Sequence, residues 1–151
     1  AEELVSFILE KFPAVRHVVV TGGEPFLFDL TEVSKRLLDA GRTVAVETSA
    51  TEPARIDARA WVTASPKIGM PGGRKVLTEV LARADEIKMA VEGEKDIEEL
   101  KNEVLPFVSE KAFVYVQPVS QSPSATALCT QAAMREGWRV SFQMHKYLAI
   151  R

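Results

Sequence analysis

Short apolar runs rich in β-branched residues alternate along this chain with segments of helical periodicity. Several runs are apolar at successive positions, as expected for strands that are covered on both faces. The runs occupy residues 16–21, 42–48, 60–65, 85–91, 112–117 and 138–143. Alternating strands and helices form crossover units with parallel strands. We therefore predict an α/β fold built on a six-stranded parallel sheet.

Helical patterns fill much of the sequence between these runs. One candidate opens with Asp29 and Glu32, which have the spacing of a capping box, and ends at Gly41. The other predicted helices cover residues 1–12, 94–108 and 123–137. A complete eight-stranded barrel needs about 250 residues, so 151 residues predict an open doubly wound sheet or a partial barrel. In both, ligands bind at the carboxyl ends of the strands.

Composition excludes several classes of function. The net charge is −2 and no run of Lys or Arg exceeds a pair, so we predict no nucleic-acid partner. No apolar run approaches the roughly 20 residues that span a bilayer, and no secretory signal pattern is present. The single cysteine, Cys129, lies among apolar residues in a predicted helix and is expected in the core. These features predict a cytoplasmic protein without a membrane partner.

Polar residues follow nearly every predicted strand, although the strand bodies are apolar. The groups are Thr21 to Glu24, Glu47 to Ser49, Ser65 to Lys67, Lys88, Gln117 to Gln121, and Gln143 to Lys146. Such convergence is typical of a polar pocket above an apolar core. Individually, each group has a simpler interpretation. The glycine pair fits an ordinary turn, Pro66 and Pro118 fit strand ends, and His145 fits a local hydrogen bond.

The stretch TGGEP at residues 21–25 narrows the chemistry of this pocket. Its spacing differs from that of phosphate-binding glycine loops, and the acid Glu24 would repel an anion. Paired glycines allow the backbone to approach a ligand closely, and a carboxylate accepts hydrogen bonds from an ammonium group. Pro25 cannot donate to a strand ladder and leaves the turn open. We predict a site for an amino group.

TGGEP resembles the GGE motif of radical S-adenosylmethionine enzymes, which contacts the amino group of the cofactor's methionine part. Further segments together resemble 7-carboxy-7-deazaguanine synthases. These segments are VETSAT (46–51), TASPK (63–67), EIKMAVE (86–92), VQPVSQ (116–121) and GWRVSFQMHKYLAIR (137–151). GGEP alone indicates only the superfamily, whereas SPK, QPVSQ and the ending in this order indicate the specific family.

This resemblance implies a partial TIM-like barrel of the radical S-adenosylmethionine type, (β/α)6, in a homodimer. It implies a carbon–nitrogen lyase of queuosine biosynthesis that converts 6-carboxy-5,6,7,8-tetrahydropterin to 7-carboxy-7-deazaguanine with loss of ammonia. The implied cofactors are S-adenosylmethionine, a 4Fe–4S cluster and Mg²⁺. An external electron donor such as flavodoxin would reduce the cluster, which then generates the radical that starts the ring contraction.

The resemblance also implies two sets of binding residues. The cofactor set comprises Gly22, Gly23, Glu24, Thr48, Ser49, Ser65, Lys67, Gln117 and Pro118. Its members would contact the methionine ammonium, the ribose, the methionine carboxylate or the adenine. The substrate set would face the pterin and comprises Thr21, Gln143, His145 and Arg151, the last through its terminal carboxylate.

Cluster binding is where this sequence departs from the family pattern. The family uses three cysteines near its N-terminus, whereas Cys129 is the only cysteine here. We therefore interpret residues 1–151 as one C-terminal portion of the enzyme, without the first strand and cluster loop and inactive alone. No catalytic residue or metal ligand is assigned within it. Two alternatives stay open: another radical S-adenosylmethionine enzyme, such as a glycyl-radical activating enzyme, or a non-catalytic binding fragment.

Overall fold

A computed structural model describes residues 1–68 and 74–144 of the chain. Its single sheet has six parallel strands in the order β1-β2-β3-β4-β5-β6. The strands are β1 (His17–Val20), β2 (Thr43–Thr48), β3 (Trp61–Ala64), β4 (Glu86–Val91), β5 (Phe113–Pro118) and β6 (Arg139–Val140). All six predicted strands are confirmed, with β6 shorter than expected. Because the spatial order follows the chain, the strand order does not reverse as it does in a doubly wound sheet.

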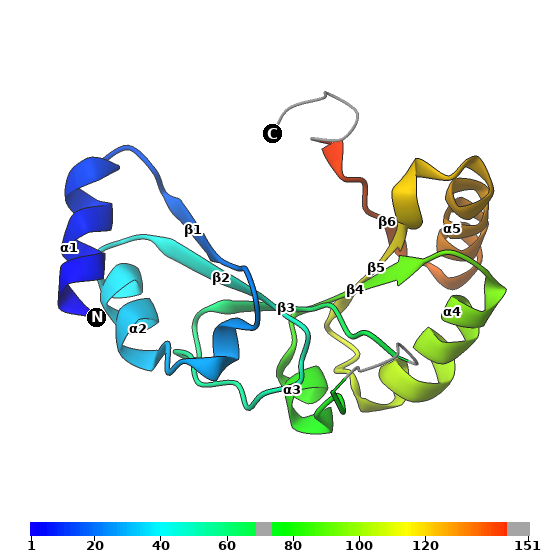
Figure 1. The fold of residues 1–151 in the computed structure, drawn as a ribbon, viewed down its shortest axis with the longest axis horizontal. Coiled ribbons are helices and arrows are strands. Elements are labelled where there is room, and N and C mark those ends of the chain that lie inside the picture. The colour runs from blue at the N-terminus through cyan, green and yellow to red at the C-terminus, as the bar shows by residue number, and fades with distance from the viewer. Residues whose placement is uncertain (69–73, 145–151) are drawn as a thin grey trace.

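The sheet is strongly curved, and the helices lie along its outer side (Figure 1). The helices are α1 (Glu2–Lys11), α2 (Thr31–Asp39), α3 (Thr78–Arg83), α4 (Glu94–Glu99) and α5 (Pro123–Glu136). This arrangement is a partial barrel, with one face of the sheet covered by helices and the other facing a hollow. Sequence periodicity missed α3 because its six residues complete fewer than two turns. No helix in the described ranges is long and apolar enough to cross a membrane.

Two local predictions about helices are wrong. The helix expected over residues 94–108 is α-helical only to Glu99, and a π-helical turn and a 3-10 turn follow it. Pro106 lies in that last turn, where its missing N–H prevents an α-helical ladder from continuing. The capping box before α2 is also absent. Asp29 accepts from Thr31 N at 2.9 Å, but Glu32 pairs with Arg36 at 2.5 Å instead of reaching back.

The core lies between the sheet and its helices. Successive side chains of a strand point to opposite faces, so every second residue reaches this core. Val46, Val62, Ile87 and Val116 are fully buried there, packed with Val80 and Leu81 of α3, Ile97 of α4 and Cys129 and Ala132 of α5. Their strand neighbours, including Glu47 and Lys88, therefore face the hollow.

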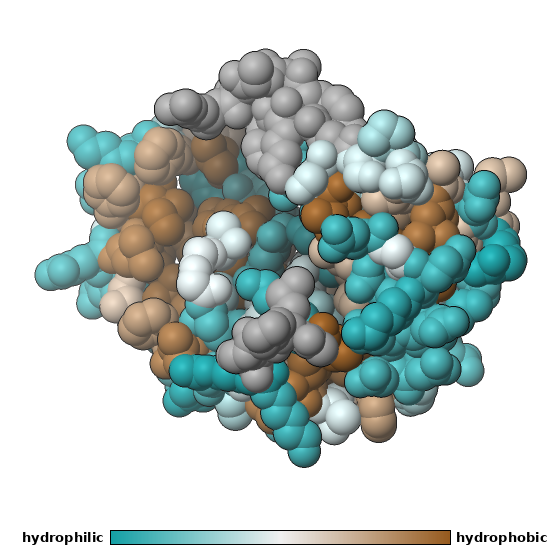
Figure 2. Space-filling view, turned by 45° about the vertical axis from the view of Figure 1, so that its right-hand side comes forward, coloured by the Kyte–Doolittle hydropathy of each residue, from teal (hydrophilic) through white to brown (hydrophobic). Residues whose placement is uncertain are grey.

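Hydrophobic and hydrophilic residues gather over different parts of the surface, mainly the left and right of Figure 2 respectively.

Candidate functional site

Two glycines turn the chain from the end of β1 toward the end of β2. Gly22 and Gly23 have φ angles of 93° and 57°, in the left-handed region that residues with a Cβ rarely adopt. Their conformation brings Glu24 to the carboxyl end of the neighbouring strand. The paired glycines of the sequence therefore have a specific backbone role at this turn.

The Glu24 carboxylate connects the segments that follow β1 and β2. Its Oε1 accepts from Phe26 N at 3.1 Å and from Thr48 Oγ1 at 2.6 Å. Its Oε2 accepts from Ser49 N at 2.8 Å and from Ser49 Oγ at 2.5 Å. Burial raises the pKa of Glu24, but the bonds from Ser49, Thr48 and Phe26 together lower it below 4.5. Glu24 is thus an ionised carboxylate held by neutral donors.

Ala50 has a strained backbone next to this carboxylate. Its φ is 60° although it has a side chain, and it is fully buried. The Ala50 N–H donates to Thr48 Oγ1 at 3.0 Å, and its carbonyl accepts from Leu77 N at 2.8 Å. These bonds hold the turn that presents Ser49 to Glu24. Sequence analysis missed this feature because alanine gives no signal for a left-handed conformation.

A cavity of about 340 Å³ opens beside Glu24. It is lined by Gly23, Glu24, Leu27, Ser49, Thr51, Lys67 and Arg74. Four of these residues, Gly23, Glu24, Ser49 and Lys67, belong to the predicted cofactor set. Leu27, Thr51 and Arg74 were not predicted. The cavity thus combines one carboxylate with two cations, which matches the opposite charges of an α-amino acid.

The other predicted cofactor residues lie at the same edge of the sheet but do not line this cavity. Thr48 is buried and bonded to Glu24. Ser65 donates through Oγ to the Lys88 carbonyl at 2.9 Å, and its N–H donates to the Thr48 carbonyl at 2.7 Å. Gln117 and Pro118 end β5. Gly22 lies within the turn, and its surroundings within 4 Å leave room for a Cβ.

The predicted substrate residues are only partly described. Thr21 directly follows β1, and Gln143 lies beyond β6, so they belong to strands at the two borders of the sheet. His145 and Arg151 lie outside the described residues. The two described members, Thr21 and Gln143, thus follow strands at opposite borders of the sheet, and the assignment of the set to a pterin stays a prediction.

A charged pair lies on the hollow face of the sheet. Lys88 Nζ approaches Glu47 Oε1 at 2.8 Å, bridging β4 and β2 across β3. The Lys88 side chain is only 19% exposed. Nearby Glu86 has its pKa raised by burial, an effect that the Lys88 charge partly opposes. The sequence alone did not show whether the Lys88 side chain faces solvent or a pocket. Its pairing with Glu47 indicates a role inside the hollow.

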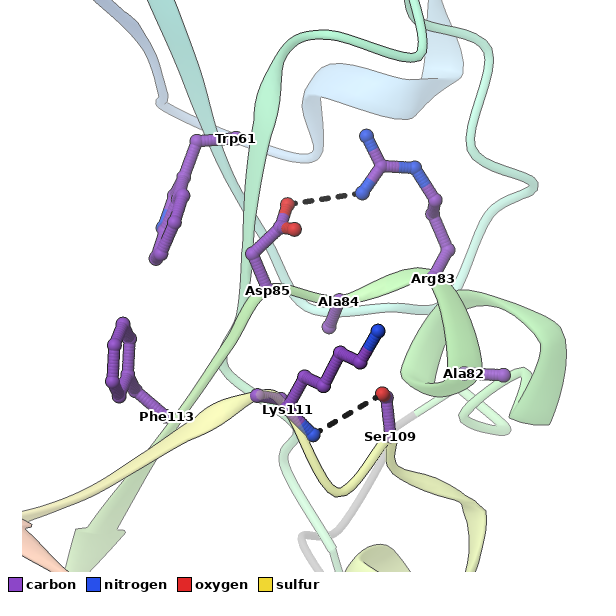
Figure 3. A pocket seen from close by; sticks show the side chains of 9 residues that line it. Trp61, Ala82, Arg83, Ala84, Asp85, Ser109, Lys111 and Phe113 are labelled. Atoms are coloured by element: carbon purple, nitrogen blue, oxygen red, sulfur yellow. Dashed lines mark hydrogen bonds and ion pairs between the residues drawn. The ribbon is translucent and has the colours of Figure 1, made fainter.

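A second cavity, of about 330 Å³, lies at the amino ends of β3, β4 and β5 (Figure 3). Trp61 and Phe113 form one side, and Asp85, Arg83 and Lys111 point into the space beside them. Arg83 pairs with Asp85 at 2.9 Å and also donates to the carbonyl of Ala60 at 2.7 Å. Asp85 Oδ2 in turn accepts from Val62 N at 2.9 Å. Arg83 and Asp85 satisfy each other and the nearby backbone, so we assign this cavity a structural role.

Metal ligands are not grouped in the described part of the chain. No cluster of three or more His, Cys, Asp or Glu residues suited to a metal ion occurs within residues 1–68 and 74–144. Cys129 is fully buried, and burial raises its pKa to about 11. It is therefore an apolar core residue, as predicted from the sequence, and unsuited to bind iron.

Comparison with known proteins places the chain in a family. No family model matches the sequence. It is 41% identical over 151 residues to the 7-carboxy-7-deazaguanine synthase of Escherichia coli strain K12, covering 99% of this chain and 68% of that protein. It is 36% identical to the 7-carboxy-7-deazaguanine synthase of Buchnera aphidicola subsp. Schizaphis graminum, covering 99% of this chain and 67% of that one. The chain belongs to the 7-carboxy-7-deazaguanine synthase family.

A solved structure supports the same assignment. The crystal structure of QueE from Escherichia coli matches with a TM-score of 0.88 at 40% identity, covering 94% of this chain and 63% of that chain. The resemblance and the α/β fold class inferred from the sequence are confirmed. This member of the 7-carboxy-7-deazaguanine synthase family spans about two thirds of the length of its relatives, between 67% and 68% for the two named above. The cavity beside Glu24 lies within this shared part.

Proposed function

We propose that the full-length protein containing this chain makes 7-carboxy-7-deazaguanine, the compound in the name of its relatives. The proposed reaction is that of a radical S-adenosylmethionine lyase. It consumes 6-carboxy-5,6,7,8-tetrahydropterin, releases ammonia and serves queuosine biosynthesis in the cytoplasm. The observation that carries the proposal is the cavity beside Glu24, because its charges suit the amino-acid part of S-adenosylmethionine.

Glu24 is proposed to receive the methionine ammonium. Two carboxylate oxygens offer about four acceptor positions, and four protein donors already occupy them. The ammonium would displace the Ser49 hydroxyl, since that hydroxyl has a second partner in Thr51 Oγ1 at 2.9 Å. The two bonds from the backbone N–H groups of Phe26 and Ser49 and the bond from the Thr48 hydroxyl would remain. They would keep Glu24 ionised and oriented.

Lys67, which lines the same cavity, is proposed to bind the methionine carboxylate. The residue is exposed, and no hydrogen bond or ion pair to it is found among residues 1–68 and 74–144. Its ammonium is therefore available to an anionic ligand. Thr48, Ser49 and Ser65 would lie toward the ribose, and Gln117 and Pro118 toward the adenine, in line with the order of the strands.

The hollow face is proposed to hold the pterin. Glu47 can accept N–H donors from the amino-substituted edge of a pterin, and Lys88 keeps the carboxylate in place at 2.8 Å. Thr21, Gln143, His145 and Arg151 are proposed to contribute further contacts. The Lys88 side chain is 19% exposed and that of Glu47 is 43% exposed, so this charged pair favours a polar substrate, because an apolar one would remove both charges from water without new partners.

The remaining cofactors and partners are not held by the described residues. Cys129 is buried, so we propose that cysteines outside these 151 residues bind the 4Fe–4S cluster. The cluster, once reduced by a flavodoxin-type donor, would supply the electron that cleaves S-adenosylmethionine to a radical. Mg²⁺ prefers grouped oxygen ligands, and we assign it no ligand within this part of the chain. The proposed assembly is a homodimer.

The test uses the full-length protein, reconstituted anaerobically with iron and sulfide. Given S-adenosylmethionine, a reductant and 6-carboxy-5,6,7,8-tetrahydropterin, it should form 5′-deoxyadenosine and 7-carboxy-7-deazaguanine. A protein that forms 5′-deoxyadenosine without the deazaguanine would belong to another radical S-adenosylmethionine activity, such as glycyl-radical activation. A protein that stays colourless and forms neither compound would be a binding protein, and the proposal would be wrong.

A further inference from the structure

Arg74 is an unpredicted cation in the cavity beside Glu24. It contacts Glu52 of the loop after β2 and shares the cavity with Lys67. Because Glu24 is saturated by neutral donors, its charge is not cancelled by either cation. The cavity lining therefore combines one carboxylate with two positive charges that do not pair with it. A single ligand carboxylate has room for more than one cationic partner.

Arg74 is held by an ion pair that leaves most of its donors available. Its Nη1 bonds to Glu52 Oε1, with the Arg74 side chain 65% exposed and that of Glu52 23% exposed. A guanidinium carries five N–H donors in a fixed planar fork and binds carboxylates through two of them at once. The same group that contacts Glu52 is thus suited to a second carboxylate entering the cavity.

We propose that Arg74 binds the carboxylate of the amino-acid part of the ligand together with Lys67, and that Glu52 competes with the ligand for Arg74. This proposal rests on the proposed function, since S-adenosylmethionine is the ligand assigned to the cavity. Glu52 sets the orientation of the guanidinium before the ligand binds and repels the incoming carboxylate. Arg74 therefore determines selectivity for adenosyl ligands that keep their amino-acid part.

A structural role for Arg74 makes a different prediction. An exposed ion pair contributes about 0–1 kcal/mol to folding, so its loss would change every ligand's affinity little and equally. A carboxylate-binding role changes affinity only for ligands with a carboxylate. It also gives Glu52 and Arg74 substitutions opposite effects, because one removes the binding group and the other removes its competitor.

The experiment measures the dissociation constants of two probes for the full-length, reconstituted protein by calorimetry. S-adenosylhomocysteine contains the amino-acid carboxylate, whereas 5′-methylthioadenosine lacks it. Arg74→Gln should weaken the affinity for S-adenosylhomocysteine about fivefold, which is the upper range for an exposed pair. It should leave the affinity for 5′-methylthioadenosine unchanged. Glu52→Gln should strengthen the affinity for S-adenosylhomocysteine about twofold. Arg59→Gln is the matched control, because Arg59 pairs with Asp57 and Asp39 away from the cavity.

Each contrary result has a distinct meaning. If S-adenosylhomocysteine binds the unsubstituted protein normally but Arg74→Gln leaves its affinity unchanged, the role of Arg74 is wrong and the proposed function stands. Equal weakening of both probes would show a structural role and also overturn the proposal. If the unsubstituted protein binds neither probe, the proposed function itself is wrong. Thermal unfolding of each variant checks that the fold is intact.

Discussion

Two cavities of nearly equal volume, about 340 and 330 Å³, lie at opposite edges of the sheet, at the carboxyl and amino ends of its strands respectively. Each contains one carboxylate and two cations. At the carboxyl end these are Glu24, Lys67 and Arg74, and at the amino end they are Asp85, Arg83 and Lys111. The types of charged group therefore do not distinguish a ligand site from a structural one.

The difference lies in where the hydrogen bonds go. At the amino end, Arg83 pairs directly with Asp85 and also binds the carbonyls of Ala58 and Ala60, so the charge of the one carboxylate in this cavity is cancelled within the protein. At the carboxyl end, Glu24 is bound only by neutral donors and Lys67 lacks a bond among the described ranges. A carboxylate whose charge is not cancelled by a cation, at the carboxyl end of a parallel sheet, indicates a ligand site.

Substitution of Glu24 should cause the largest change in ligand affinity at the carboxyl-end cavity. In the full-length protein, Glu24→Gln removes the charge and turns an amide NH₂ toward donors that need an acceptor. The affinity for S-adenosylmethionine should fall about 10- to 100-fold, since hydrogen bonds to charged groups contribute roughly 1.5–3 kcal/mol. Calorimetric titration measures this change. Glu32→Gln, which removes the same charge from the surface pair with Arg36, is the control and should bind normally.

Substitution at the amino end should affect stability without affecting ligand affinity. Arg83→Ala removes the ion pair of the Asp85 carboxylate, which keeps its bond from Val62 N, and the side-chain donor of the Ala60 carbonyl. The free energy of unfolding should fall by about 1–3 kcal/mol, the usual cost of an unsatisfied polar group. Urea unfolding measures this loss, and titration with S-adenosylmethionine should give the dissociation constant of the unsubstituted protein. A weakened affinity would contradict the structural assignment of this cavity.

The pH dependence of stability provides a smaller test. The pKa of Glu24 is lowered below 4.5 in the folded protein, so its contribution to stability is present above that pH. The contribution is lost as the pH falls through the folded-state pKa. Unfolding free energies measured from pH 7 downward should decline more steeply below pH 4.5 in the unsubstituted protein than in Glu24→Gln. Parallel curves would mean that the four bonds to Glu24 do not favour its ionised form.

Lys111 should show the smallest effect. Its side chain points into the amino-end cavity (Figure 3), but it is exposed and has no ion pair among those found in the described residues. Lys111→Ala should change the free energy of unfolding by less than about 0.5 kcal/mol, as is usual for surface substitutions. It should leave S-adenosylmethionine binding unchanged. A tenfold loss of affinity would indicate that the ligand binds at the amino end of the sheet, which would contradict this account.

The sequence predicted those features that depend on local patterns. Apolar β-branched runs located all six strands, and the TGG stretch located the turn that carries Glu24. The helical periodicity over residues 94–108 did not reveal that the α-helix ends at Glu99 and continues as a π-helical turn and a 3-10 turn that contains Pro106.

Features that depend on tertiary pairing were not predictable. Arg74 lies in a loop remote from any strand end, and nothing in its neighbours indicates that it reaches the Glu24 cavity. The four donors to Glu24 come from two segments about 25 residues apart in sequence, which only the sheet brings together. The ion pair in which Arg83 neutralises the charge of Asp85 likewise depends on the directions of these side chains, at the end of α3 and just before β4.

A crystal structure of the full-length, reconstituted protein with S-adenosylmethionine tests the central claim most directly. The account predicts that the methionine ammonium lies within hydrogen-bond distance of Glu24 and that the methionine carboxylate contacts Lys67 and Arg74. The amino-end cavity lined by Arg83 and Lys111 should contain no adenosyl ligand. A methionine part bound away from Glu24, or a ligand in the amino-end cavity, would contradict the account.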